Sequence, residues 1–157
     1  MSIMIKILFV CLGNICRSPM AEFVLKDMVK QRGLADEFVI ASSATSREEI
    51  GNPVHPGTQR KLAQVGISTA GKYAVQITKA DYDRYDYLLA MDSSNLRNLS
   101  RLFPSDPEKK IHRLLDFSDR PRDIADPWFT GNFDVTYDDV VEGCEAFLNY
   151  VLENNLL

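Results

Sequence analysis

Short apolar segments alternate along this chain with segments of helical periodicity. Residues 3–10 are apolar apart from Lys6 and rich in β-branched side chains, which is typical of a strand buried within a parallel sheet. Similar but shorter segments predict strands at 38–41 and 86–91. Residues 111–114 form a weaker candidate for a fourth strand.

Segments of helical periodicity separate and follow these strands. In the first, Ser18 is a candidate N-cap, Pro19 suits the first helical position and Gly33 ends the pattern. The other predicted helices are 59–65, 95–103 and 137–152. Because strands alternate with helices, we predict an α/β fold in which a parallel sheet carries helices on both faces. Such folds bind ligands beyond the carboxyl ends of the strands, where the segment after the first strand lies.

Composition narrows the possible classes of protein. The 157 residues fit a single domain, residues 1–157, that can bury a core without metals or disulfides. A net charge of −4 offers no basic face, so we expect neither nucleic acid nor a membrane as a partner. The odd number of cysteines, 3, does not fit a secreted disulfide framework, and the N-terminal segment resembles neither a membrane span nor a signal peptide. We therefore expect a cytoplasmic protein with reduced thiols; no oligomeric interface is evident.

The segment between the first strand and the first helix carries the chemistry. It reads Cys11-Leu12-Gly13-Asn14-Ile15-Cys16-Arg17-Ser18-Pro19. A short loop at this place can direct several backbone N–H groups inward and, with the helix N-terminus behind it, form an anion site. Gly13 adopts positive φ at little cost, and Asn14 tolerates it better than most residues. The loop is therefore able to curl around three phosphate oxygens.

Cys11 lies at the floor of this loop, where the same dipoles favour the nucleophilic thiolate. The planar guanidinium of Arg17 can hold two oxygens of a phosphoryl group, and the Ser18 hydroxyl can bond the Cys11 sulfur. A lone cysteine after a buried strand is usually a small apolar side chain, but Arg17 and Ser18 favour the catalytic interpretation. A nucleotide-binding loop would need Gly-Lys-Ser/Thr, and a thioredoxin-type pair would need two residues between Cys11 and Cys16 instead of four.

A cysteine that attacks a phosphate ester at this loop would also need a proton donor for the oxygen of the leaving group, and the thiolate cannot supply that proton. The best candidate is Asp126, which Pro127 holds in an extended loop. We expect Trp128 and Phe129 to wall the cleft, shield this carboxyl from water and favour its protonated form. The alternative is a plain acidic turn residue, since Asp-Pro often begins a turn. The other acidic residues of this loop are expected to be solvated: Asp116, Asp119 and Asp123.

These motifs resemble the low-molecular-weight protein tyrosine phosphatases over nearly the whole chain. The resemblance rests on segments 11–19, 42–56 and 86–95 and on the Asp126-Pro127 loop. It implies a four-stranded parallel sheet flanked by helices, a flavodoxin-like three-layer sandwich. It also implies a protein tyrosine phosphatase that needs no metal and no cofactor. The expected partners are proteins that contain phosphotyrosine, or small aryl phosphates.

The resemblance implies a two-step mechanism. Cys11 attacks phosphorus while Arg17 and the loop amides hold the equatorial oxygens. Asp126 protonates the leaving oxygen to give a phosphocysteine, and it then acts as the base on the water that releases phosphate. The substrate-binding residues are predicted to be Leu12, Gly13, Asn14, Ile15, Cys16, Ser18, Trp128 and Phe129.

Four further positions are compared with the family. Asn14 resembles its loop-shaping residue, and Ser42 resembles the partner of that residue in a supporting hydrogen-bond network. Cys16 resembles a second loop cysteine that can form a disulfide with the nucleophile under oxidation. The family's histidine before the third strand, which belongs to the supporting network, is missing. The local sequence is Thr69-Ala70-Gly71-Lys72-Tyr73.

Other proteins share the fold and the loop. Arginine phosphatases carry Thr where this chain has Ile15, so Ile15 favours phosphotyrosine. Thioredoxin-coupled arsenate reductases add a later cysteine pair, whereas only Cys144 follows here. A non-catalytic phosphate-binding module would need neither Cys11 nor Asp126. Beside the site, Glu48 stands near the place of a common family aromatic, and an acidic rim disfavours strongly acidic phosphopeptides.

Overall fold

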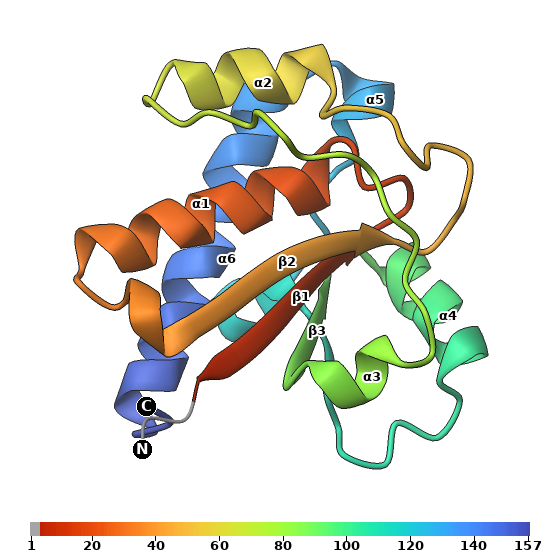
Figure 1. Cartoon of the computed structure of the whole chain (residues 1–157), viewed down its shortest axis with the longest axis vertical. Helices are drawn as coiled ribbons and strands as arrows, with labels where there is room; N and C mark the ends of the chain where they lie inside the picture. The colour runs from red at the N-terminus through yellow and green to blue at the C-terminus, as the bar shows by residue number, and fades with distance from the viewer. Residues whose placement is uncertain (1–3) are drawn as a thin grey trace.

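A parallel sheet forms the centre of the molecule (Figure 1). The structure, a computed structural model, describes residues 4–157, so Ile3 of the first predicted strand lies outside the described residues. The strands pair in the order β2-β1-β3-β4, and every pairing is parallel. The predicted fold class is confirmed, including the weakly indicated fourth strand. The bounds are β1 (Ile5–Cys11), β2 (Phe38–Ala44), β3 (Tyr87–Ala90) and β4 (Ile111–Arg113).

Helices cover both faces of this sheet. Their bounds are α1 (Arg17–Gln31), α2 (Pro56–Ala63), α3 (Asp81–Arg84), α4 (Ser93–Leu102), α5 (Pro127–Thr130) and α6 (Phe133–Glu153), with 3-10 turns η1 (Ala35–Glu37) and η2 (Leu114–Phe117). Figure 1 shows α1 and α6 on one face, and α3 and α4 on the other. The short helices α2 and α5 lie near the carboxyl ends of the strands, beside the loop that follows β1.

β1 is buried on both faces, which explains its nearly continuous apolar sequence. Ile7 and Phe9 belong to the core that α1 and α6 cover. Leu8 and Val10 alternate with them and pack in the second core, on the side of α4. In the sheet, β1 lies between β2 and β3. The chain passes from β1 to β2 on one side of β1 and then crosses to β3 on the other side, so the strand order reverses between β1 and β3. The loop after β1 therefore lies at the switch point where such folds bind ligands.

The start of α1 differs from the prediction. Helix α1 begins at Arg17 and its N-cap position is Cys16, whose side chain makes no capping bond, so the predicted cap by Ser18 is wrong. Pro19 is the third helical residue, which is tolerated because the N–H groups of the first turn have no intrahelical partner anyway. The Ser18 hydroxyl turns instead toward Cys11.

Other helix and strand boundaries also differ from the predicted ones. β2 extends to Ala44, three residues past the predicted end, because the buried Ser42 and Ser43 continue the pairing with β1. α2 begins at Pro56 after an N-cap at His55, and α6 begins at Phe133 after an N-cap at Asn132. The short helices α3 and α5 were not predicted. Within residues 4–157, no helix combines the length and apolar character that crossing a bilayer requires.

Candidate active site

Cys11 ends β1 and its sulfur receives donors from the loop that follows. The backbone N–H groups of Asn14 and Ser18 donate to Sγ at 3.3 and 3.4 Å, and the Ser18 hydroxyl lies 3.0 Å from it. Asn14 adopts φ 58°, the left-handed conformation that it was expected to tolerate, whereas Gly13 does not take positive φ. Donors that converge on a sulfur stabilise its anionic form.

The Asn14 amide anchors this loop from behind. Its Nδ2 donates to Ser18 Oγ at 2.8 Å and to Ser42 Oγ at 2.9 Å. Its Oδ1 accepts from the backbone N–H of Val75 at 3.1 Å. The structure thus brings together the two residues that the sequence linked in a supporting network, Asn14 and Ser42.

Arg17 is buried at the first position of α1, with 2% of its side chain exposed. One guanidinium nitrogen donates to Asp92 Oδ2 at 2.6 Å and to the Ile124 carbonyl at 2.8 Å, and the other reaches Asp126 at 3.4 Å. Burial acts to lower the pKa of Arg17, but the negative charges of Cys11, Asp92 and Asp126 outweigh it and raise this pKa above its usual value. The guanidinium is therefore a fixed cation beside the sulfur.

Asp92 is a site residue that the sequence did not single out, although it lies in the segment 86–95 that carries the family resemblance. It is the N-cap of α4, where its Oδ1 accepts from the Asn95 N–H at 2.7 Å. Its second oxygen is left to bind Arg17. The helix cap and the orientation of the guanidinium thus depend on the same carboxylate.

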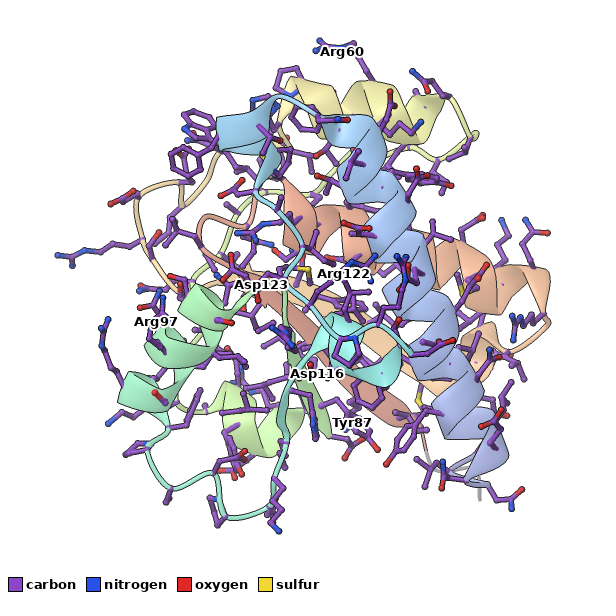
Figure 2. All side chains as sticks on the ribbon, turned by 180° about the vertical axis from the view of Figure 1, so that it is seen from behind. Arg60, Tyr87, Arg97, Asp116, Arg122 and Asp123 are labelled. Atoms are coloured by element: carbon purple, nitrogen blue, oxygen red, sulfur yellow. The ribbon has the colours of Figure 1, made fainter. Side chains whose placement is uncertain are left out.

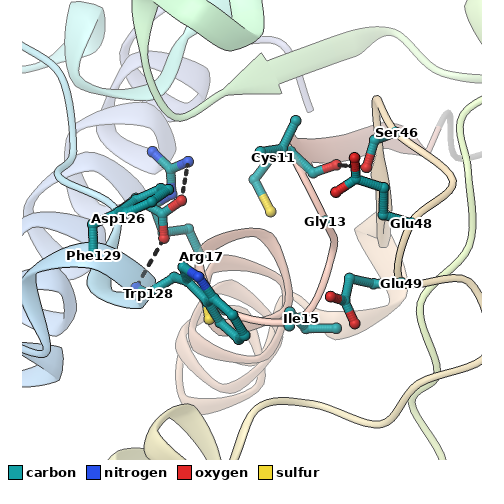
Figure 3. Close-up of a pocket in the computed structure, with 12 residues that line it drawn as sticks. Cys11, Gly13, Ile15, Arg17, Ser46, Glu48, Glu49, Asp126, Trp128 and Phe129 are labelled. Carbon is teal, nitrogen blue, oxygen red and sulfur yellow. Dashed lines mark hydrogen bonds and ion pairs between the residues drawn. The ribbon is translucent and has the colours of Figure 1, made fainter.

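Asp126 enters the site from the loop before α5. It is the N-cap of this short helix and accepts from the Trp128 N–H at 3.0 Å. Trp128 and Phe129 line the same cavity as Asp126, as expected of residues that wall the cleft, although their own side chains are 58% and 79% exposed. The Asp126 side chain is 21% exposed, and its carboxyl contacts the Trp128 N–H and Arg17, as Figure 3 shows.

These side chains line one cavity of about 180 Å³ (Figure 3). The loop after β1 forms its floor, and the loop between β2 and α2 supplies an acidic rim with Glu48 and Glu49. Of the predicted substrate-binding residues, Asn14 and Ser18 lie behind the lining, and the others contribute to it. The lining is Cys11, Leu12, Gly13, Ile15, Cys16, Arg17, Ser46, Glu48, Glu49, Asp126, Trp128 and Phe129.

The three cysteines were expected to be reduced, and Cys11 and Cys16 were expected to form a disulfide under oxidation. Cys11, Cys16 and Cys144 are all free and buried. Burial, together with the negative charges of Cys11 and Asp126, raises the pKa of Cys16 to about 12, so it remains a thiol at neutral pH. Burial also raises the pKa of Cys144 on α6. A disulfide between Cys11 and Cys16 under oxidation stays a prediction.

The remaining acidic residues of the Asp126 loop lie outside the pocket, and Figure 2, which views the molecule from behind, labels two of them, Asp116 and Asp123. Asp116 and Asp123 were expected to be solvated. Both keep nearly half of their side-chain surface exposed, but both also pair with Arg113, at 2.8 and 2.9 Å. Asp119 is exposed as predicted.

His55 connects the loop after β1 with the loop that carries Asp126, a role that was not predicted from the sequence. Its backbone N–H donates to the Ile15 carbonyl at 2.8 Å. Its ring stacks on Phe133 at 5.2 Å and meets Trp128 edge-on at 5.6 Å. Its Nδ1 accepts from the Gly57 N–H and caps α2. A histidine isolated in sequence gives no signal for such a role, which depends on contacts 40 or more positions away in the sequence.

Comparison with known proteins places this geometry in a family. A family model described as low molecular weight phosphotyrosine protein phosphatase matches residues 6–156. The low molecular weight protein-tyrosine-phosphatase YfkJ of Bacillus subtilis is 42% identical over 147 residues, which cover 92% of this chain and 94% of that protein. The crystal structure of YfkJ matches with a TM-score of 0.92 and 40% identity over 96% of each chain.

Two further solved structures widen the comparison. SP-PTP, a low molecular weight protein tyrosine phosphatase from Streptococcus pyogenes, is 42% identical with a TM-score of 0.84, over 94% of this chain and 93% of that one. A Drosophila arginine phosphatase is 34% identical with a TM-score of 0.87, over 93% of this chain and 97% of that one. Since the family model and YfkJ both span nearly the whole chain, this protein belongs to the low molecular weight protein tyrosine phosphatases, a family of cysteine-dependent hydrolases.

Proposed function

We propose that this enzyme hydrolyses phosphotyrosine, and small aryl phosphates, through a phosphocysteine intermediate on Cys11. The observation that carries the proposal is that the Cys11 sulfur, the Arg17 guanidinium and the Asp126 carboxyl line one small cavity. Each of the three groups supplies one requirement of phosphoryl transfer: a nucleophile, a cation for the oxygens and an acid for the leaving group.

In the first step, an electron pair of the Cys11 sulfur forms a bond to phosphorus as the bond to the phenolic oxygen breaks. The loop N–H groups and Arg17 hold the equatorial oxygens. A phosphoryl group that binds Arg17 places a second negative charge beside the Asp126 carboxyl, and Asp126 enters this step carrying a proton. Asp126 then gives its proton to the phenolate, and free tyrosine leaves.

In the second step, the Asp126 carboxylate takes a proton from a water molecule, whose oxygen bonds to phosphorus. The sulfur–phosphorus bond breaks and its electron pair returns to Cys11. The Ser18 hydroxyl and the backbone N–H groups around the sulfur stabilise the departing thiolate. Inorganic phosphate is the product, and the enzyme regains its starting form.

The lining also supports an aryl substrate. Leu12, Ile15 and Trp128 provide apolar surface around the floor, where a phenyl ring can pack above its phosphate. The likeness to a Drosophila arginine phosphatase gives phosphoarginine as the second candidate. A guanidine substrate would carry positive charge, which the rim residues Glu48 and Glu49 could accept.

The test compares Asp126→Asn with Asp119→Asn, a matched control in the same loop that is exposed and outside the pocket. A general acid contributes about 10²–10⁴-fold, and it matters most for a basic leaving group. We expect the burst rate of Asp126→Asn to fall by about that factor with phosphotyrosine and by less with an activated aryl phosphate. Asp119→Asn should keep the wild-type rates.

Equal loss with both leaving groups would show that Asp126 is not the acid. Cys11→Ser should abolish turnover while phosphate binding remains. Hydrolysis of phosphotyrosine, phosphoarginine and phosphoserine peptides, measured side by side with a chelator, identifies the substrate class. Faster turnover of the phosphoarginine peptide would contradict the assignment to phosphotyrosine.

A further inference from the structure

The mouth of the cavity has two opposite walls of different chemistry, as Figure 3 shows. One wall is formed by α5, which presents Trp128 and Phe129. The other is formed by the loop between β2 and α2, which presents two adjacent carboxylates, Glu48 and Glu49. Cys11 lies between these walls in Figure 3. A substrate that reaches the sulfur therefore passes an aromatic surface on one side and an acidic surface on the other.

The aromatic wall leaves apolar surface in contact with water. Phe129 is 79% exposed and Trp128 is 58% exposed. Leu12, which lines the same cavity, is 40% exposed. Side chains exposed to this degree gain little hydrophobic stabilisation from folding, because the gain follows the apolar area removed from water. Exposed apolar side chains that gather beside a binding cavity indicate a contact surface for a partner.

The acidic wall carries charges that the described part of the chain does not neutralise. Within residues 4–157, neither Glu48 nor Glu49 forms an ion pair. The Glu49 carboxylate accepts from Asn52 Nδ2 at 2.6 Å, and this neutral amide orients the carboxylate without cancelling its charge. Of the described residues that line the cavity, Arg17 alone is basic, and it already pairs with two other carboxylates.

These two glutamates lie close enough to the phosphate-binding loop to affect a substrate. Glu49 Cγ is 3.2 Å from the position that a Cβ would take at Gly13, in the floor of the cavity. Negative charge at this distance repels a phosphate dianion. A substrate offsets the repulsion when it brings a positive group to the same wall. Because Glu48 is exposed at the rim, a positive side chain outside the cavity can reach it.

We propose that the two walls recognise the residues that flank phosphotyrosine in the substrate protein. The aromatic wall binds an apolar side chain through Phe129, and the acidic wall binds a lysine or arginine through Glu48 and Glu49. The proposal rests on the proposed function, in which the phosphotyrosine is held above Cys11. In an extended segment, the residues two positions before and two positions after the phosphotyrosine point to the same face as it does, each about 7 Å away along the chain. These are the positions that face the walls.

Four phosphotyrosine peptides test this proposal, with alanine at all other positions. Two positions before and after the phosphotyrosine they carry Leu and Lys, Lys and Leu, Leu and Leu, or Lys and Lys. Acidity alone would favour the peptide with two lysines, and apolar surface alone would favour the peptide with two leucines. Two different walls favour a mixed peptide. We expect the better mixed peptide to exceed both symmetric peptides in kcat/KM by about 2–5-fold at low salt, the effect of one exposed charge pair.

Variants assign each preference to its wall. The double variant Glu48→Gln/Glu49→Gln should lose the advantage of the mixed peptide over the two-leucine peptide and keep its advantage over the two-lysine peptide. Phe129→Ser should show the reverse. Asp119→Asn removes an exposed acid outside the cavity, and Val135→Ser removes an apolar side chain on α6 that is 47% exposed and also outside it. Both controls should keep the two advantages.

The same ranking should appear in binding without turnover. Trp128 is the single tryptophan of the chain, so its fluorescence reports the binding of each peptide to Cys11→Ser. The proposal is wrong if a symmetric peptide is the best substrate, if all four peptides bind Cys11→Ser equally, or if the double glutamine variant keeps the advantage over the two-leucine peptide. Failure of the proposed function would look different, because the wild-type enzyme would then hydrolyse none of the four peptides.

Discussion

Gly57 is the position where a single added methyl group should disturb catalysis from outside the pocket. It lies in the first turn of α2, against the ring of Phe133 at the start of α6. A Cβ at Gly57 would lie 2.3, 2.4 and 2.7 Å from three ring atoms of Phe133. Gly57 has no positive φ, so Gly57→Ala strains the packing and not the backbone.

The magnitude follows from the contacts around this ring. To reach ordinary contact at 3.4 Å, the Phe133 ring must retreat by about 1 Å. The Phe133 ring stacks on His55, and the His55 ring meets Trp128, two residues after Asp126, the proposed acid. Overpacking of this kind costs about 1–3 kcal/mol of stability. A displacement of about 1 Å in a catalytic group can cost about 10²-fold in rate.

We therefore expect Gly57→Ala to lower the burst rate with phosphotyrosine by up to about 10²-fold and to lower it less with an activated aryl phosphate. The double variant Gly57→Ala/Phe133→Leu should recover part of the rate, because the smaller side chain makes room for the methyl group. Stability is measured by urea unfolding alongside the stopped-flow assay.

Gly143→Ala is the matched control for this experiment. Its Cβ would lie 2.5 Å from Leu114 Cγ, in the core under α6, so a similar collision occurs away from the acid loop. Helix propensity favours the alanine by about 1 kcal/mol, yet overpacking of about 1–3 kcal/mol should outweigh it. The control should lose stability without any dependence on the leaving group. If Gly57→Ala keeps wild-type burst rates, or loses rate equally with both leaving groups, the proposed path from Phe133 to Asp126 is wrong.

Two further predictions concern charges away from the reacting atoms. Hydrogen bonds from Arg122 and Ser118 lower the pKa of Glu142 from 4.5 to about 2, so its contribution to stability is present above pH 4.5 and is lost as the pH falls toward 2. Since the Glu142 side chain is 29% exposed, we expect Glu142→Gln to lower the free energy of unfolding at pH 7 by only about 1 kcal/mol. Urea titrations should show that this difference between the variant and the wild type shrinks below pH 4.5. A difference that stays constant at every pH would contradict the prediction. Glu48→Lys reverses one charge of the pocket rim and should lower the KM of acidic phosphopeptides at low salt but not at high salt, whereas a salt-independent change would point to contact and not charge.

The sequence predicted best what is local along the chain. The loop from Cys11 to Ser18 carries the proposed nucleophile, the cation Arg17 and the Ser18 hydroxyl that contacts the sulfur within eight positions, so their proximity requires only one turn and the start of a helix. Asp126 was predicted because its carboxyl and the Pro that follows it are adjacent in the sequence. Its surroundings were not found: the exposure of Trp128 and Phe129 depends on how the whole loop packs, and neighbouring apolar residues alone do not decide it.

The residues that the sequence missed act across long separations. Asp92 reaches Arg17 over 75 positions, and Lys72 reaches the Ser42 carbonyl over 30. In the sequence, Asp92 can be explained as a helix cap and Lys72 as a surface charge. Nothing in the sequence pattern therefore distinguishes them from the many residues that serve only as caps or surface charges. Their second partner exists only once the parallel sheet has placed the carboxyl ends of β1, β2 and β3 together.

The misplaced end of β2 shows why the site lies where it does. The prediction ended this strand at Ala41 because two serines follow, and polar residues are unusual inside a parallel sheet that is covered on both faces. The strand continues because those serines are paired with β1, and because the Ser42 hydroxyl has partners on both sides, Glu22 and Asn14. Such partners offset the cost of burying the Ser42 hydroxyl, whereas the Ser43 hydroxyl is buried without a hydrogen-bond partner among residues 4–157. The polar residue Ser42 therefore stands at the end of this strand because the strand ends beside the candidate site, where the Asn14 amide and the Glu22 carboxylate meet its hydroxyl.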